Sequence, residues 1–121
     1  MKFDIATTLR KYIHALNTQD LPALAKMYAN DVSLVEWDEN EFRGIDEVLS
    51  SNEEMFEKNP EIQFLTVNYA FNDYSAFVDL VIYLTEEDQK TGKSIRVVDE
   101  IFFDTAESPK IFLIRAYKGF S

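Results

Sequence analysis

The sequence contains no cysteine, one histidine, three glycines and three prolines in 121 residues. The absence of cysteine excludes disulfide bonds, thiolate nucleophiles and cysteine-ligated metal centres. The only histidine, His14, lies off the apolar stripe of its predicted helix and is expected at the surface. With this single imidazole, we expect neither a Ser-His-Asp triad nor a histidine-rich zinc site. We therefore predict a protein without a metal ion or a cofactor.

Basic residues are also scarce, because 12 Lys and Arg face 22 Asp and Glu and leave a formal net charge of -10. Phosphate binding needs a basic stripe, and none is visible, so we expect no nucleic-acid partner and no docking to anionic membranes. No window approaches the roughly 18 apolar residues of a membrane span, and the start of the chain has no apolar leader. We expect a cytoplasmic protein.

Hydrophobic residues are abundant, at 46% of the chain, and aromatic residues make up 14%. An acidic disordered segment lacks this aromatic content, so the composition indicates a compact domain with a substantial core. There is no internal repeat, linker or low-complexity tract. We predict one domain over residues 1–121.

Helical periodicity dominates the first half of the chain. The first predicted helix has one apolar stripe, formed by Ile5, Leu9, Tyr12, Ile13 and Leu16. Asp20 is suited to cap a second, short helix, and Pro22 fits its first turn. That helix has its apolar side at Leu21, Leu24, Met27 and Tyr28. A third helix is predicted over residues 45–58 and ends before Pro60.

The remaining segments are rich in β-branched and aromatic residues, which is typical of strands. We predict strands at residues 32–37, 62–71, 74–85, 94–104 and 111–118. A polar loop over 38–44, an exposed hairpin loop over 86–93 and a loop over 104–110 connect these elements. The pattern predicts an α+β domain with one long, bent antiparallel sheet and its helices on one face.

Four segments carry a recognisable pattern, in order and spacing: Tyr12 to Leu21, Met27 to Val32, Phe42 to Ile45 and Val98 to Asp104. Together they resemble the nuclear-transport-factor-2-like superfamily, which includes ketosteroid isomerases and SnoaL-like polyketide cyclases. The resemblance implies a cone-shaped curved sheet that encloses an apolar pocket together with three N-terminal helices. It also implies a small apolar ligand and a homodimer that forms through the outer face of the sheet.

Asp99 is the most informative candidate residue. It shares one face of its predicted strand with Ile95, Val97, Ile101 and Phe103, so its carboxyl group is expected to be desolvated and its pKa raised. By resemblance, Asp99 and Tyr12 match the Asp and Tyr that form an oxyanion hole in ketosteroid isomerase. In the alternative interpretation, Asp99 hydrogen-bonds to a backbone or tyrosine group inside the core.

Glu36 matches the position of the general base in the isomerases, although it is one methylene longer than their Asp. Asp38 points to the same face two residues later and is an alternative base. Glu36 could instead face solvent or pair with Arg43. We also predict that the pocket wall includes Trp37, Phe56, Val97 and Ile101.

Asp79 interrupts a predicted strand between Phe77 and Val81, and we expect it on the outer face of the sheet. The sequence leaves three functions open. The first is an enzyme that enolises or isomerises a small apolar ketone without a cofactor. The second is a non-catalytic module that binds an apolar ligand or mediates dimerisation, and the third is a protein adaptor.

Overall fold

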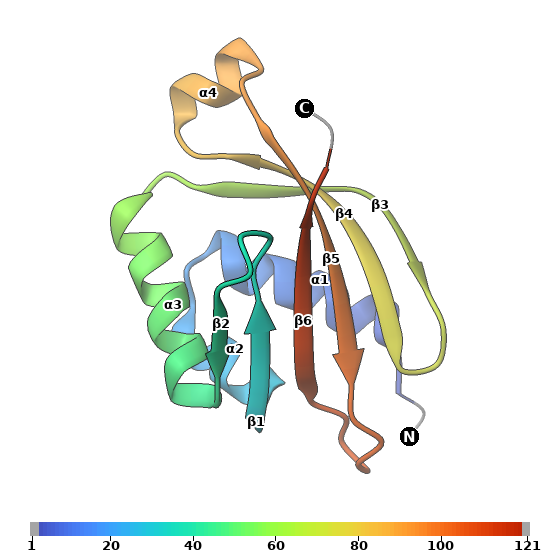
Figure 1. Cartoon of the computed structure of the whole chain (residues 1–121). Coiled ribbons are helices and arrows are strands. Elements are labelled where there is room, and N and C mark those ends of the chain that lie inside the picture. The colour runs from blue at the N-terminus through green and yellow to red at the C-terminus, as the bar shows by residue number, and fades with distance from the viewer. Residues whose placement is uncertain (1–2, 120–121) are drawn as a thin grey trace.

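The computed structural model describes residues 3–119 of the chain (Figure 1). Its elements follow the order α1 (Ile5–Asn17), α2 (Leu21–Met27), β1 (Tyr28–Val35), β2 (Glu41–Arg43), α3 (Ile45–Lys58), β3 (Gln63–Phe71), β4 (Ser75–Tyr83), α4 (Glu86–Thr91), β5 (Ile95–Phe103) and β6 (Ile111–Lys118). The predicted α+β class and the three N-terminal helices are confirmed.

The first two helices begin at the side-chain caps that their sequences provide. Asp4 accepts a hydrogen bond from the backbone amide of Thr7, and Asp20 accepts one from the amide of Ala23. These bonds satisfy amides that have no partner within the helix. Four residues of the predicted apolar stripe of α1 are buried, and the fifth, Ile13, is half-buried and packs against the core.

Six strands form one sheet in the order β2-β1-β6-β5-β4-β3. Every neighbouring pair is antiparallel except β1 and β6, which run parallel. The prediction of an antiparallel sheet therefore misses one pair. Parallel neighbours need a long connection, and the chain between β1 and β6 supplies one that contains α3, α4 and four strands.

Three local boundaries also differ from the predicted ones. Tyr28 begins β1 instead of ending α2, and β2 occupies part of the expected loop 38–44. The expected hairpin loop 86–93 contains α4, because Thr85 caps the amide of Asp88 and acidic residues fill the first turn. Acidic side chains stabilise a helix at its N-terminal end, where the helix dipole is positive. Gly92, at φ +77°, ends this helix in the left-handed conformation.

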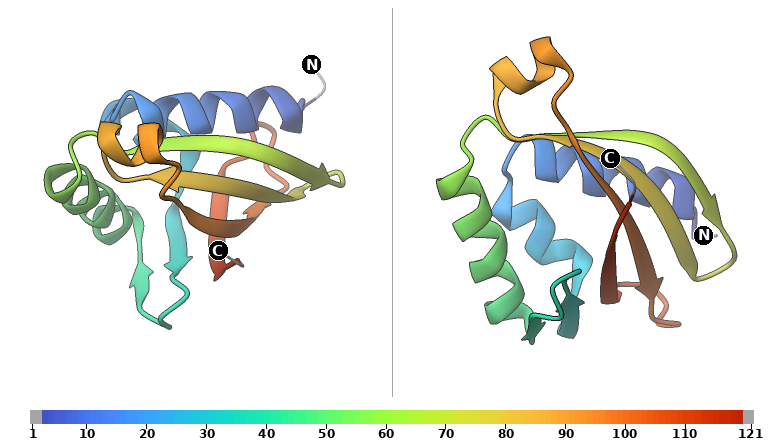
Figure 2. Two further views of the ribbon diagram at one scale, coloured as in Figure 1. Left: turned by 90° about the horizontal axis from the view of Figure 1, so that it is seen from above. Right: turned by 45° about the horizontal axis from the view of Figure 1, so that its top comes forward.

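The helices α1, α2 and α3 gather on one face of the curved sheet, while α4 stands apart at one end (Figures 1 and 2). α1 packs against β3, and α3 packs against β1 and β2. Asn17 fastens the end of α1 to β3. Its side-chain nitrogen donates to the carbonyl oxygen of Phe64 at 3.0 Å, and its oxygen accepts from the amide of Phe64 at 2.7 Å.

Strand alternation separates an inner face from an outer one. On β5, Val97, Ile101 and Phe103 are buried on the inner face. Asp79 lies on the outer face, as predicted, where both of its carboxylate oxygens accept from Arg96 at 2.9 Å. Within residues 3–119, no helix has both the length and the apolar character that crossing a membrane requires.

Candidate active site

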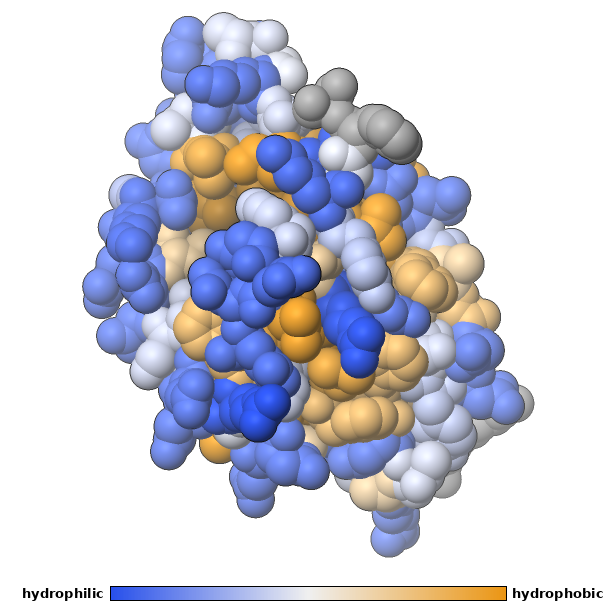
Figure 3. Space-filling view, in the orientation of Figure 1, coloured by the Kyte–Doolittle hydropathy of each residue, from blue (hydrophilic) through white to orange (hydrophobic). Residues whose placement is uncertain are grey.

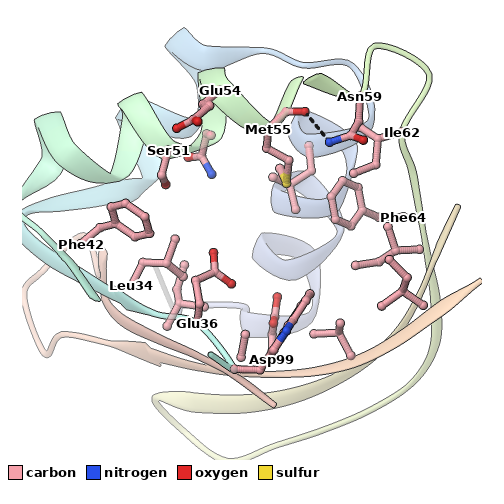
Figure 4. Close-up of a pocket in the computed structure, with 18 of the residues that line it drawn as sticks. Leu34, Glu36, Phe42, Ser51, Glu54, Met55, Asn59, Ile62, Phe64 and Asp99 are labelled. Atoms are coloured by element: carbon pink, nitrogen blue, oxygen red, sulfur yellow. Dashed lines mark hydrogen bonds between the residues drawn. The ribbon is translucent and has the colours of Figure 1, made fainter. Parts of the chain in front are cut away.

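A cavity of about 420 Å³ opens between α3 and the inner face of the sheet. Most of its wall is apolar, and the aromatic residues in it are Tyr12, Tyr28, Trp37, Phe42 and Phe64. Two carboxyl groups, those of Glu36 and Asp99, point into this cavity from the sheet (Figure 4).

Glu36 enters the cavity because it continues the alternation of β1. Val32 and Leu34 are buried on the inner face, and Glu36 is the next residue of that series, just beyond the end of the strand. Burial raises the pKa of Glu36, and the nearby charge of Asp38 raises it further. Arg43 does not pair with Glu36, since its guanidinium lies 3.1 Å from Glu41 instead.

Asp99 enters from the middle of β5, at the place that the sequence predicts. It pairs with Val78 on one side and with Ala116 on the other, and both of these residues are buried. Burial, and then the charge of Glu36, raise the pKa of Asp99 from 3.8 to about 7. The carboxyl group therefore retains a proton in weakly acidic solution.

Ala116 separates the two acids. The parallel pairing of Val35 with Arg115 leads to Glu36 beside Ala116, and Ala116 is paired directly with Asp99. The backbones of the two acids are therefore two strand spacings apart, or about 10 Å. Because Ala116 contributes only a methyl group, the space between the acids stays open to a ligand.

Tyr12 lies at the helical side of the cavity, next to Tyr28, which the sequence placed on the apolar side of the second helix and not in the site. The ring centroids of Tyr12 and Tyr28 are 6.4 Å apart in an edge-to-face arrangement. Burial raises the pKa of Tyr12 well above its usual value and raises that of Tyr28 to about 12. Both phenols are therefore neutral donors at physiological pH.

Asn52 is the other functional candidate that sequence reasoning missed. It is buried on α3, and its side-chain oxygen accepts a hydrogen bond of 2.8 Å from the hydroxyl of Tyr28. Its spacing could have predicted its burial, because Asn52 falls four residues after Val48 and four before Phe56 on the buried face of α3.

The mouth of the cavity is polar. Trp37, Asp38 and Asn40 contribute from the turn between β1 and β2. On α3, the ammonium group of Lys58 lies 2.6 Å from a carboxylate oxygen of Glu54, with both side chains well exposed. Surface pairs of this kind contribute little to stability.

The four predicted wall residues divide into two groups. Trp37 and Val97 line the cavity, whereas Phe56 and Ile101 pack in the hydrophobic core and do not line it. Phe56 lies on the fully buried side of α3, and Ile101 is paired with Ala76 and Ile114 within the packed sheet. Alternation identified the inner face but not where the core ends and the cavity begins.

Within residues 3–119, no group of three or more His, Asp or Glu side chains is placed to hold a metal ion. The polar side chains that line the cavity carry carboxyl, phenol, amide, hydroxyl, indole and ammonium groups.

Comparison with known proteins places this arrangement in a family. The SnoaL-like domain family matches residues 9–112. The chain belongs to this family. No match was found among curated proteins.

Solved structures share the fold of this SnoaL-like domain. An NTF2-like protein of unknown function from Cytophaga hutchinsonii is 18% identical, with a TM-score of 0.74 over 98% of this chain and 95% of that one. A SnoaL-like protein of unknown function from Burkholderia thailandensis is 16% identical, with a TM-score of 0.79 over 98% of this chain and 99% of that one. A Kribbella flavida protein, provisionally named a ketosteroid isomerase, is 19% identical, with a TM-score of 0.70 over 93% of this chain and 76% of that one. At these identities, the likeness establishes the NTF2-like fold alone.

Proposed function

We propose that this SnoaL-like protein enolises or isomerises a small apolar ketone without a cofactor. The observation that carries the proposal is the entry of Glu36 and Asp99 into one apolar cavity from either side of Ala116, with Tyr12 in the same wall. The provisional name of the Kribbella flavida structure is in keeping with this chemistry.

In the proposed reaction, the carboxylate of Glu36 removes a proton from the carbon next to the ketone carbonyl. The electron pair of the broken C–H bond forms a C=C bond, and the carbonyl electrons move onto oxygen. Tyr12 and protonated Asp99 donate hydrogen bonds to that oxyanion. Glu36 then returns the proton to the same carbon or to another carbon of the conjugated system, which balances the step.

The two carboxyl groups differ in the way this division of roles requires. Asp99 is half-buried in the middle of the sheet and has a pKa raised to about 7, so in weakly acidic solution it holds a proton and can donate. Glu36 lies beside the mouth, next to Trp37 and Asp38, and its negative charge adds to the effect of burial in raising the pKa of Asp99, so we assign Glu36 as the carboxylate of the pair. Pairs of acids whose surroundings push their pKa values apart are typical of acid–base sites.

Binding of a planar phenol, which mimics a dienolate, tests the oxyanion site. We expect 2-naphthol to bind at pH 6 with a dissociation constant that calorimetry can measure. Tyr12→Phe and Asp99→Asn should each weaken this binding by about 10-fold, which is about 1.4 kcal/mol and typical of one hydrogen bond to a charged group. Asp79→Asn is the matched control, because Asp79 lies on the neighbouring strand and faces away from the cavity. Equal affinity in all four proteins would contradict the assigned donors.

Proton exchange tests the reaction itself. Incubation of cyclohexenones and steroid enones in D₂O, followed by NMR, should show enzyme-dependent exchange next to the carbonyl, and Glu36→Gln should lower its rate by at least about 100-fold. If ligands bind but no ketone exchanges, the catalytic proposal fails and the domain is a ligand-binding module.

We also propose that the protein forms a homodimer through the outer face of its sheet. That face carries exposed apolar side chains, including Leu65, Phe77 and Tyr117, and Phe77 is 50% exposed. Figure 3 shows groups of hydrophobic side chains interspersed with hydrophilic ones on the face that it presents. The ion pair between Asp79 and Arg96 removes net charge there, so two copies of an acidic chain can approach.

A further inference from the structure

The charged groups around the cavity are unevenly distributed. Among the described residues that line it, Lys58 is the only basic one, and it is paired with Glu54 at the rim. Three other acidic residues, Glu36, Asp38 and Asp99, line the cavity without a basic partner among the lining residues. The interior therefore presents an excess of negative charge to any ligand.

The acids also act on one another. The charge of Asp38 raises the pKa of Glu36, and the charge of Glu36 raises that of Asp99. At pH 7.5, above the pKa of about 7 for Asp99, both carboxyl groups are mostly ionised. Like charges that share a poorly hydrated site repel, and a cation placed between them relieves the repulsion. Ala116 leaves open the space between Glu36 and Asp99 where such a cation would lie.

The wall contributes a second feature that suits a cation. Tyr12, Tyr28, Trp37, Phe42 and Phe64 supply aromatic rings around the same space. The faces of aromatic rings attract ammonium groups, and they do so more strongly where water is excluded. The formal net charge of -10 attracts cations and repels anions over a longer range.

We infer that the cavity selects its ligand by charge and prefers a ring compound that carries a protonated amine over neutral and acidic compounds of the same shape. This inference rests on the proposed function for the cavity as the ligand site. It adds the class of ligand, which is a ring compound with a basic amine substituent. Carboxylic acids and phosphorylated compounds are excluded as good ligands.

A set of three compounds with one naphthalene frame tests this preference by isothermal titration calorimetry at pH 7.5. The compounds are 2-naphthylmethylamine, 2-naphthalenemethanol and 2-naphthoate. We expect the amine to bind roughly 10- to 100-fold more tightly than the alcohol, from one or two charge pairs at intermediate dielectric. The acid should bind more weakly than the alcohol.

Two variants with the same change in charge locate the effect. Glu36→Gln should reduce the preference for the amine over the alcohol to within about threefold. Glu39→Gln should leave it unchanged, because Glu39 lies in the same turn but is not among the residues that line the cavity. Equal binding of amine and alcohol, tighter binding of the acid, or a preference that survives Glu36→Gln overturns the inference.

The outcome is separable from that of the proposed reaction. Preference for the amine in a protein that exchanges no ketone proton supports charge selection and refutes the enzyme. Proton exchange without preference for the amine supports the enzyme and refutes charge selection.

Discussion

Replacement of Asp99 by Asn should stabilise the protein in neutral and alkaline solution. Between about pH 4 and pH 7, the unfolded chain has lost the Asp99 proton while the folded protein retains it, because the pKa rises from 3.8 to about 7 on folding. The folded state then binds more protons than the unfolded state, so the free energy of unfolding falls as pH increases through this range. Well above pH 7, Asp99 is ionised in both states, and its effect on the free energy of unfolding no longer changes with pH.

The magnitude follows from the size of this shift. One pKa unit corresponds to about 1.4 kcal/mol, so a rise of about three units costs about 4 kcal/mol once both states are ionised. That is a large part of the stability of a small domain, which is typically 5–15 kcal/mol. Asn has nearly the same shape as Asp and no charge to desolvate. Asp99→Asn should therefore raise the free energy of unfolding at pH 8 by up to about 4 kcal/mol.

Urea denaturation followed by circular dichroism, at several values between pH 5.5 and pH 8.5, measures this difference. The range stays above the isoelectric point of about 4.4. Asp79→Asn is again the control, because it breaks an ion pair on the outer face and should lower stability at every pH. An Asp99→Asn variant that is no more stable than the natural protein at pH 8 would refute the reasoning from burial.

Three further predictions concern other parts of the molecule. Phe77→Glu should shift the mass measured by light scattering from dimer to monomer, and unchanged mass would exclude this face as the interface. Asn17→Ala removes both hydrogen bonds to the backbone of Phe64 and should lower the free energy of unfolding by about 1–3 kcal/mol in urea; an unchanged midpoint would show that the contact contributes nothing. Tyr28→Phe leaves the buried oxygen of Asn52 without its 2.8 Å donor and should cost about 1–3 kcal/mol, whereas Tyr28→Phe combined with Asn52→Leu should recover part of that loss.

The sequence predicted the elements whose patterns are local. Period-2 alternation placed Asp99 on the inner face of β5, and the stripe of α1 placed Tyr12 toward the core. These assignments require only that one face of each element is buried.

The parts that the sequence did not predict depend on contacts between distant segments. Nothing near β1 indicates that its neighbour is β6 or that the pair is parallel. The bond from Tyr28 to Asn52 joins residues that are 24 positions apart. Phe56 and Ile101 were assigned to the pocket because a wall residue and a core residue have the same apolar pattern, and only packing distinguishes them.

The central position of β6 has a consequence for how the site is assembled. Glu36 follows β1 and Asp99 lies on β5, and these strands contact each other only through β6. Before β6 pairs with β1, the two acids have no fixed separation. The helices and the β3–β4–β5 meander can form earlier, because their contacts are closer in sequence. The pairing of β1 with β6 joins segments that are far apart in the sequence. Because pairings of this kind form slowly, we expect the candidate site to be the last region of the domain to become ordered during folding.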